Sequence, residues 1–137
     1  MDTRPVTVFF YGLFMDEDLL KSKGVVVRGA RSAYVDGLLL KIGQRAVLVP
    51  ATNARCYGML FDLTHAELGV LYAAADLQSY RPEAVLARIA DYKHVAALCY
   101  NVFETVDDST RNPEYAAKLR AVLGKLSFPS AYIQSVQ

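Results

Sequence analysis

The chain has 137 residues, of which 53% are hydrophobic and 21% are charged, and its formal net charge is +1. This size and composition are typical of a folded domain with a single core, and they exclude a disordered chain. No apolar run is long enough to span a bilayer, and no basic cluster offers a footprint for nucleic acid. We therefore expect residues 1–137 to form a single domain that binds neither membrane nor nucleic acid.

The first segment, MDTRPVTVFF, has Asp2 and Pro5 where a secretory signal needs a basic and then an apolar region. The expected compartment is therefore the cytoplasm. Cys56 and Cys99 stand far apart in strand-like stretches and form no CxxC pattern. We expect buried free thiols and no disulfide.

The predicted elements begin with a strand over residues 6–11, followed by a glycine turn and a short helix capped by Asp16. Residues 25–61 then have a β pattern throughout, interrupted by glycine and proline residues. These interruptions predict strands of about five residues each. Such short strands favour a strongly bent sheet or a small barrel.

The second half of the chain is predicted to carry most of the helices. Residues 64–67, THAE, have the pattern of a capping box, and the helix that they begin is expected to reach about Ala74. Two strands should follow, the second over HVAALCYNVFE. Asn112 and Pro113 then begin a further helix that ends at Gly124. Because strands come first and helices are interspersed late, the fold class is α+β and not a doubly wound parallel sheet.

The residue types that most often bind metals or act as nucleophiles give few leads. His65 lies in the capping box and His94 begins a strand, and no carboxylate is spaced to support either ring. A glycine-rich phosphate loop is also missing from the sequence. We expect neither a metal site nor a nucleotide cofactor.

The stretch FFYGLFM ends the first strand with Tyr11-Gly12 and leads directly into the acidic helix. Glycine suits an ordinary turn, but it also lets the backbone approach a ligand closely. Backbone N–H groups at the start of a helix can hold an anion. On these residues alone, a plain turn and an anion pocket both stay open.

Among the carboxylates, Asp76 is the most informative. Residues 16–18 fit a helix start, and Asp107 and Asp108 fit a solvated loop. Asp76 instead follows a helix and precedes the strand that begins near Tyr80. On its own, an aspartate in such a place is most often a turn residue that makes an Asx-type hydrogen bond.

Four stretches, in this order, resemble the γ-glutamylcyclotransferase-like superfamily, which includes the AIG2-like proteins. They are FFYGLFM, VDGLLLKIGQRAVLVPATNARCYGMLFDL, LYAAADLQSYRPEAVLARI and EYAAKLRAVLGKLSFPSAYIQSV. The resemblance implies a small mixed β-barrel with flanking helices that uses no metal and no cofactor. It also implies an enzyme that converts a γ-glutamyl amide to 5-oxoproline and frees the amine.

The same resemblance implies roles for particular residues. The turn would form a backbone cradle for the negative charge of the substrate, with the members Tyr11, Gly12, Leu13 and Phe14. Asp76 would be the acid/base that takes a proton from the α-ammonium and passes one to the leaving nitrogen. Tyr80 and Tyr132 would line the pocket or orient the carboxylate. With the resemblance, a cradle is favoured over a plain turn.

The chain departs from the family pattern in two places. The family usually has a small hydroxyl residue and then leucine after Tyr-Gly, whereas this chain has Leu13 and Phe14. The resembling enzymes place a glutamate four residues before the strand tyrosine, where this chain has the shorter Asp76. Misplacing a catalytic group by about 1 Å can cost on the order of a hundredfold in rate. Glu83 is the less favoured alternative as acid/base.

Three interpretations stay open. The protein is a working cyclotransferase, a module on the same fold that binds a small glutamyl-like or other amino-acid ligand, or a self-associating structural protein. A carboxylate that faces residues 11–14 across a polar cavity favours the first two. A raised pKa of that carboxylate favours the enzyme over the module. The amine on the γ-glutamyl group and the oligomeric state, a homodimer included, are left open.

Overall fold

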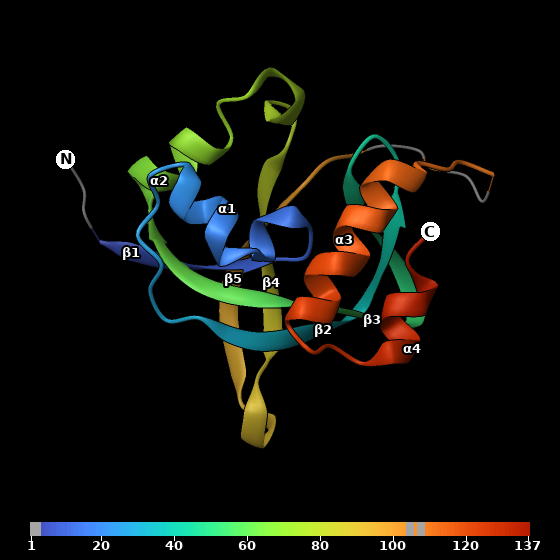
Figure 1. Cartoon of the computed structure of the whole chain (residues 1–137). Helices are drawn as coiled ribbons and strands as arrows, with labels where there is room; N and C mark the ends of the chain where they lie inside the picture. The colour runs from blue at the N-terminus through green and yellow to red at the C-terminus, as the bar shows by residue number, and fades with distance from the viewer. Residues whose placement is uncertain (1–3, 104–105, 107–108) are drawn as a thin grey trace.

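The computed structural model describes residues 4–103, 106 and 109–137. The strands of this part of the chain are β1 (Pro5–Phe10), β2 (Arg31–Ile42), β3 (Ala46–Thr64), β4 (Arg81–Arg88) and β5 (His94–Asn101). They close into a barrel in the order β1-β3-β2-β4-β5, in which β1 and β5 are parallel and the other neighbours antiparallel (Figure 1). The predicted α+β class with a small mixed barrel is confirmed.

The barrel closes through narrow seams on either side of the β4–β5 hairpin. The hairpin joins β1 through the pair Val8–Leu98 and joins β2 through the pair Tyr34–Arg88. By contrast, β4 and β5 pair with each other along their whole lengths. The hairpin is therefore a unit that docks onto the three-stranded sheet of β1, β3 and β2.

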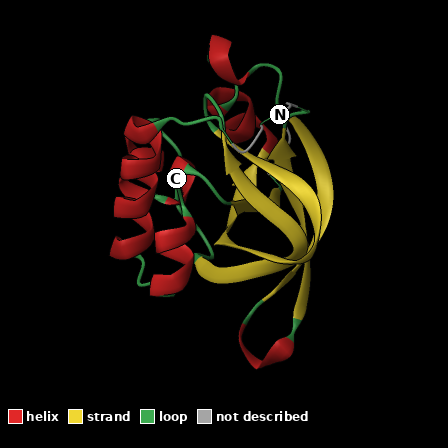
Figure 2. Ribbon diagram, turned by 90° about the vertical axis from the view of Figure 1, so that its right-hand side faces the viewer, coloured by secondary structure: helices red, strands yellow, loops and turns green. Residues whose placement is uncertain are grey.

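Helices cover one side of the barrel and surround one of its ends. The longest described helix, α3 (Pro113–Lys125), lies beside α4 (Ser130–Ser135) on the outside of the sheet (Figure 2). The remaining helical elements are α1 (Glu17–Ser22), α2 (His65–Leu71) and the 3-10 turns η1 (Leu13–Met15), η2 (Ala75–Leu77) and η3 (Ala90–Tyr92).

The long strands differ from the prediction of five-residue strands. β2 has 12 residues and β3 has 19. Gly37 bends β2 without ending it, because its φ of +89° coincides with a shift in register between Asp36 and Leu38. Such an irregularity curves a strand so that it can wrap around a barrel. Residues 25–30, which have a β pattern in the sequence, precede β2 as irregular chain.

The predicted helix starts are confirmed. The Asp16 carboxylate caps α1, and Thr64 and Glu67 form the capping box of α2. Asn112 caps α3, and Pro113 takes the first helical position. Each of these signals depends on neighbouring residues alone, so each can be identified before the fold is known.

The predicted helix ends are less accurate. α2 ends at Leu71, before Ala74, and α3 continues through Gly124 to Lys125. A lone glycine costs a helix about 1 kcal/mol relative to alanine. That cost does not end α3, because Leu119 and Leu123 anchor the helix in the core with no exposed surface.

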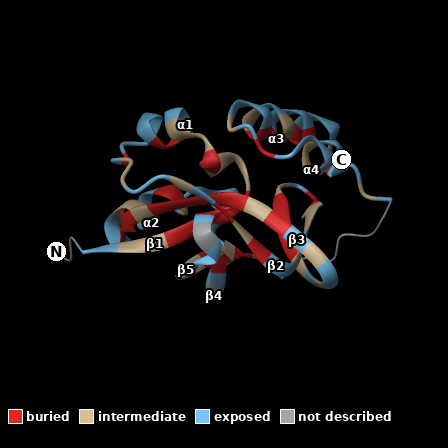
Figure 3. Ribbon diagram, turned by 90° about the horizontal axis from the view of Figure 1, so that it is seen from below, coloured by how far each residue is buried: buried red, intermediate tan, exposed pale blue. Residues whose placement is uncertain are grey.

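Buried positions lie on the strands and on the side of α3 that faces them (Figure 3). Val8 and Phe9 of β1 and Leu60 and Phe61 of β3 are fully buried in this core. Cys56 and Cys99 are buried free thiols, as expected. Burial raises the pKa of Cys56 to about 12, which keeps the thiol protonated and unreactive.

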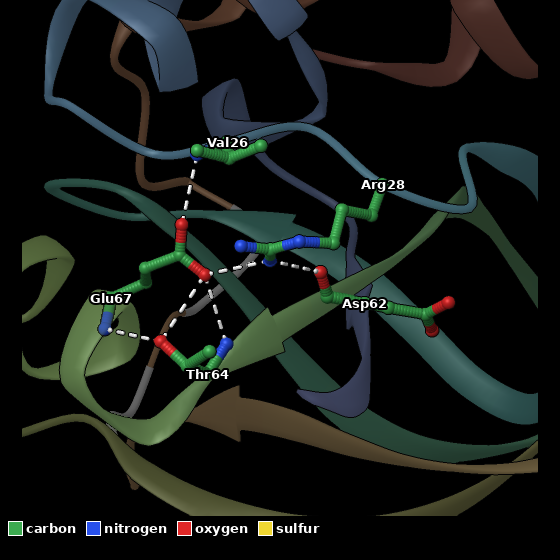
Figure 4. Close-up of polar contacts among 5 residues, drawn as sticks. All are labelled: Val26, Arg28, Asp62, Thr64 and Glu67. Carbon is green, nitrogen blue, oxygen red and sulfur yellow. Dashed lines mark hydrogen bonds and ion pairs between the residues drawn. The ribbon is translucent and has the colours of Figure 1, made fainter. Parts of the chain in front are cut away.

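Glu67 fastens the irregular chain before β2 to the start of α2 (Figure 4). Its carboxylate accepts hydrogen bonds from the backbone N–H of Val26 at 2.8 Å, from Arg28 at 2.9 Å and from the backbone N–H of Thr64 at 2.9 Å. Partial burial alone would raise the pKa of Glu67, but these hydrogen bonds outweigh it and lower the pKa to about 2. Glu67 therefore stays ionised and holds residues 26–28 in place.

Candidate functional site

The Tyr-Gly turn connects β1 to η1, and the structure gives a physical reason for its glycine. Gly12 has φ −111° and ψ −150°, an extended conformation that any residue can adopt. A Cβ added to Gly12, however, would lie 2.9 Å from the hydroxyl oxygen of Tyr115. Glycine is favoured here because α3 brings Tyr115 against the turn, and a Cβ would have to displace the Tyr115 hydroxyl.

Tyr11 ties the turn to the end of the neighbouring strand β5. Its buried hydroxyl donates to the Tyr100 carbonyl oxygen at 2.9 Å and to Asn101 Oδ1 at 3.2 Å. Asn101 in turn bonds both the backbone N–H and the carbonyl of Leu48, at 3.0 and 2.9 Å. Burial raises the pKa of Tyr11 far above its usual range, so the hydroxyl remains a donor. The end of β1 is thereby fixed to β5 and β3.

A cavity of about 240 Å³, called the aromatic cavity below, opens beside the turn. All four predicted cradle residues, Tyr11 to Phe14, line it, and so does Tyr80. Its wall also contains Tyr72 and Tyr100, whose rings stack at 4.1 Å. Among its lining residues, all of which the structure describes, none carries a carboxylate.

A second cavity of about 310 Å³, the polar cavity, adjoins the first. The residues that line both cavities are Leu13, Arg45, Tyr80 and Tyr115. Asp76 lines the polar cavity but not the aromatic one. The structure thus brings the predicted cradle, Tyr80 and Asp76 to one end of the barrel, with Asp76 on the far side of the shared residues.

Asp76 is ion-paired. It lies in η2, and its Oδ2 accepts a hydrogen bond from Arg45 Nε at 2.8 Å. The side chain is 54% exposed. The hydrogen bond from Arg45 lowers the pKa of Asp76 below its usual range. The carboxylate is therefore ionised and has no raised pKa of the kind that favours a proton shuttle.

The turn that carries Arg45 is held from several directions. Asn112 Nδ2 donates to the carbonyl oxygens of Gly43 and Gln44 at 3.1 and 3.0 Å. The Tyr80 hydroxyl donates to the Ala46 carbonyl at 2.8 Å. This bond gives Tyr80 a structural role in addition to its place in the cavity wall.

Tyr115 occupies part of the predicted cradle. Burial raises the pKa of its hydroxyl, and hydrogen bonds from the backbones of Ala46 and Leu13 oppose that rise. Of the backbone groups predicted to hold an anion, that of Leu13 thus already faces an oxygen atom of the protein itself. A ligand in the aromatic cavity meets the Tyr115 hydroxyl together with the turn.

Arg45 and Tyr115 are site residues that sequence reasoning missed. Arg45 is the one charged residue in the stretch IGQRAVLVP, and that isolation was its only signal. Tyr115 lies in the first turn of α3 at a position that reads as ordinary core packing. Neither stands near residues 11–14 in the sequence, so only the closed barrel brings them to the turn.

Two other predicted residues lie elsewhere. Tyr132, on α4, packs its ring 4.9 Å from that of Tyr57 and places its hydroxyl 3.6 Å from Cys56 Sγ. Glu83 is an exposed residue of β4, where it pairs with Cys99 of β5. Neither Tyr132 nor Glu83 lines the aromatic or the polar cavity. The structure therefore does not bring them to the cradle.

The described residues contain no cluster of three or more His, Cys, Asp or Glu side chains that could hold a metal ion. Over the same part of the chain, no helix has the length and apolar character needed to cross a membrane.

The chain matches the family model described as "Gamma-glutamyl cyclotransferase, AIG2-like" over residues 8–118. This match includes the turn of residues 11–14, Asp76, and Tyr80 and Tyr115, the two tyrosines that line both cavities. The protein belongs to the γ-glutamylcyclotransferase, AIG2-like family. No curated protein sequence matches the chain significantly.

Solved structures of the family share the fold. A γ-glutamyl cyclotransferase superposes with a TM-score of 0.79 at 14% identity, covering 97% of this chain and 88% of that one. An uncharacterised protein from Homo sapiens gives a TM-score of 0.78 at 14% identity, covering 98% and 89%. An AIG2-like protein from Mus musculus gives 0.54 at 16% identity, covering 82% of each chain.

Proposed function

We propose that the protein is a cyclotransferase that binds a γ-glutamyl amide beside residues 11–14 and converts it to 5-oxoproline and a free amine. Its family and fold support a cyclotransferase-type function. The observation that carries the proposal is the joining of two cavities at one end of the barrel. One contains the predicted cradle, the other contains Asp76, and they share a wall.

The proposed reaction needs mainly correct positioning. The substrate's α-amine attacks its own γ-carbonyl carbon, a C–N bond of the five-membered ring forms, and the bond to the leaving amine breaks. The α-ammonium loses two protons as it becomes the ring N–H, and the leaving nitrogen takes up two protons and departs as an ammonium. Well-oriented intramolecular reactions reach effective molarities of about 10⁵–10⁸ M, so holding the glutamyl group folded supplies much of the rate. The aromatic cavity, at about 240 Å³, suits a ligand of amino-acid size.

Tyr115 supports the charge that develops on the γ-carbonyl oxygen. A tyrosine hydroxyl has two acceptor lone pairs and one donor proton. The backbones of Leu13 and Ala46 and the side chain of Arg45 donate to the Tyr115 hydroxyl oxygen, so its proton is available to an oxygen in the cavity that it lines. A fixed donor aimed at developing negative charge stabilises the transition state.

Asp76 is the favoured acid/base in this proposal. The polar cavity has two carboxylates among its lining residues, Asp76 and Glu114. Glu114 is 83% exposed and lies 3.5 Å from Lys118 on the outer face of α3. Asp76 instead contacts Arg45, which belongs to the wall between the cavities. It reaches the substrate nitrogens once a ligand draws Arg45 away.

The test is 5-oxoproline release from a panel of γ-glutamyl amino acids, glutathione and γ-glutamyl amines. Wild type should release 5-oxoproline, Asp76→Asn should release none, and Asp76→Glu should retain or raise the activity. Full activity in Asp76→Asn would remove that residue from the mechanism. No release from wild type on any member of the panel would remove the enzymatic proposal.

Binding without turnover is the second candidate function, and the state of Asp76 favours it. A proton shuttle works best with a pKa near the working pH, whereas Arg45 lowers the pKa of Asp76. The aromatic cavity itself has no carboxylate in its described lining. Ligand binding by calorimetry, with no 5-oxoproline formed by wild type or by Asp76→Glu, would support this candidate.

A further inference from the structure

Arg45 stands where the aromatic and polar cavities meet. Its side chain lines both cavities and remains 33% exposed. We propose that Arg45 binds the carboxylate of the ligand in exchange for Asp76, so that the site selects γ-glutamyl ligands whose α-carboxylate is free. This inference rests on the proposed function for the ligand class, but it concerns recognition and not the chemical step.

The charge of the aromatic cavity points to an anionic ligand. Two cationic side chains line it, Arg45 and Lys23, and no carboxylate is among its described lining residues. The carboxylate that pairs with Arg45, that of Asp76, approaches from the polar cavity. The two cations differ in how far they are buried. Lys23 is exposed just after the end of α1, whereas Arg45 is half-buried. A guanidinium also matches a carboxylate with two parallel hydrogen bonds, which an ammonium cannot do. Arg45 is therefore the better anchor.

The backbone of Arg45 is fixed, so its side chain can exchange partners while its position in the wall is kept. The Arg45 carbonyl oxygen accepts the N–H of Gly43 at 2.9 Å, closing a tight turn. Asn112 holds the carbonyls before Arg45, and Tyr80 holds the carbonyl of Ala46 after it. These bonds come from the N-cap of α3 and from the residue that precedes β4.

The bond that must break is a weak one. Asp76 meets Arg45 at 2.8 Å, but its side chain is 54% exposed. Solvent-exposed ion pairs contribute little net stability, because water screens them and both side chains lose freedom. A ligand carboxylate that meets Arg45 from the aromatic cavity can therefore displace Asp76. The exchange would leave Asp76 free beside the ligand.

The inference predicts opposite effects for two substitutions at the same ion pair. Removing Arg45 removes the anchor, so a ligand with a free carboxylate should bind more weakly. Removing the charge of Asp76 removes the competitor for Arg45, so the same ligand should bind more tightly. A purely structural ion pair would instead weaken binding, or leave it unchanged, in both variants.

The experiment measures binding by calorimetry of γ-glutamylmethylamide, its α-methyl ester and 5-oxoproline. We expect Arg45→Met to weaken binding of the two free acids about tenfold or more, the cost of roughly one charged hydrogen-bonded contact. Its affinity for the ester should equal that of wild type. The affinity of Arg45→Lys for the free acids should lie between those of wild type and Arg45→Met. Asp76→Asn should bind the free acids several-fold more tightly than wild type.

The matched control is Arg55→Met. Arg55 Nε contacts Asp36 Oδ1 at 2.7 Å, both side chains are about half exposed, and neither residue lines the aromatic or the polar cavity. Removing this pair should leave all three affinities unchanged. Melting temperatures close to that of wild type would show that each variant is folded.

Several outcomes would overturn the inference. For wild type, these outcomes are equal affinity for the acid and the ester, or no binding of any probe. For the variants, they are unchanged acid binding in Arg45→Met, or weaker acid binding in Asp76→Asn. A different result separates the two proposals. If binding depends on the ligand carboxylate and on Arg45 but no 5-oxoproline is released, the proposed reaction is wrong and the proposed role of Arg45 in binding is supported.

Discussion

The hydroxyl oxygen of Tyr115 lies 2.9 Å from the point where a Cβ would stand on Gly12. Residues 103 positions apart in the chain are thus packed so closely that a methyl group on Gly12 would have to displace the Tyr115 hydroxyl. The backbone of Gly12 is extended and unstrained, so the constraint is one of space alone.

Gly12→Ala tests this relationship. We expect a loss of about 1–3 kcal/mol in the free energy of unfolding, the usual cost of overpacking a well-filled region. The measurement is urea denaturation followed by circular dichroism. Gly12→Ala combined with Tyr115→Phe should cost less than the sum of the two single changes, because the phenylalanine frees the space that the new methyl group needs. Strict additivity would contradict the proposed clash.

Gly58 of β3 gives a second, sharper prediction. A Cβ on Gly58 would lie 2.3 Å from the backbone oxygen of Phe10 and 2.6 Å from the ring of Phe9. Neither atom can move cheaply, so we expect Gly58→Ala to cost about 3 kcal/mol or to prevent folding. Gly69→Ala is the matched control. It lies in α2 with open space around it, so it should gain about 0.5–1 kcal/mol.

Glu67 should make stability depend on pH in the acid range. Its pKa is lowered from 4.5 to about 2 by the hydrogen bonds from Thr64, Arg28 and Val26, against the effect of burial. A lowered folded-state pKa gives stability that is complete above the unfolded value and is lost as the pH falls through the folded value. The contribution of Glu67 should therefore decline from about pH 4.5 to about pH 2.

Glu67→Gln isolates this contribution. We expect it to destabilise the protein by about 1–3 kcal/mol at pH 7, because an amide leaves a donor facing the N–H of Val26 or of Thr64. The difference from wild type should shrink as the pH falls below 4.5. Glu114→Gln, at a residue that is 83% exposed, is the control and should change stability little at any pH. A difference independent of pH would contradict the role given to the Glu67 charge.

If Asp76 is the acid/base, its ion pair should set the acidic limb of the activity profile. Arg45 lowers the pKa of Asp76, and a base must be deprotonated to act. The acidic limb of kcat/KM in wild type should therefore lie below the ordinary aspartate range. In Arg45→Met the limb should move to higher pH, because the lowering contact is gone. A limb in the same place in both proteins would exclude control by Asp76.

The parts of the fold that were predictable from sequence are those decided by neighbouring residues. Asp16, Thr64 with Glu67, and Asn112 each mark a helix start through bonds to backbone groups only two or three residues away. The length of β3 was not predictable in this way. Its 19 residues remain one strand because β1 pairs with its later half and β2 with most of its length.

The same distinction applies to the site. Residues 11–14 are contiguous, so the turn could be predicted as a unit, and the structure places all of it in the aromatic cavity. Arg45 and Tyr115 could not be predicted as site residues, because they meet the turn only in the closed barrel. Asp76 was identified as a candidate, but its pairing with Arg45, 31 residues away, is a tertiary contact that sequence neighbours do not determine.

The narrow seams of the barrel affect more than its shape. The β4–β5 hairpin is held to the sheet by the pairs Val8–Leu98 and Tyr34–Arg88, while its own strands are paired throughout. Opening at a seam would break few backbone hydrogen bonds, so such openings should be among the most frequent native-state fluctuations. Yet Tyr11 is fixed to the carbonyl of Tyr100 and to Asn101 across the β1–β5 seam. A molecule open at this seam would keep nearly all of its secondary structure and have no intact site, so the hydrogen-exchange rates of the backbone amides that bond β1 to β5 would report how often the site comes apart.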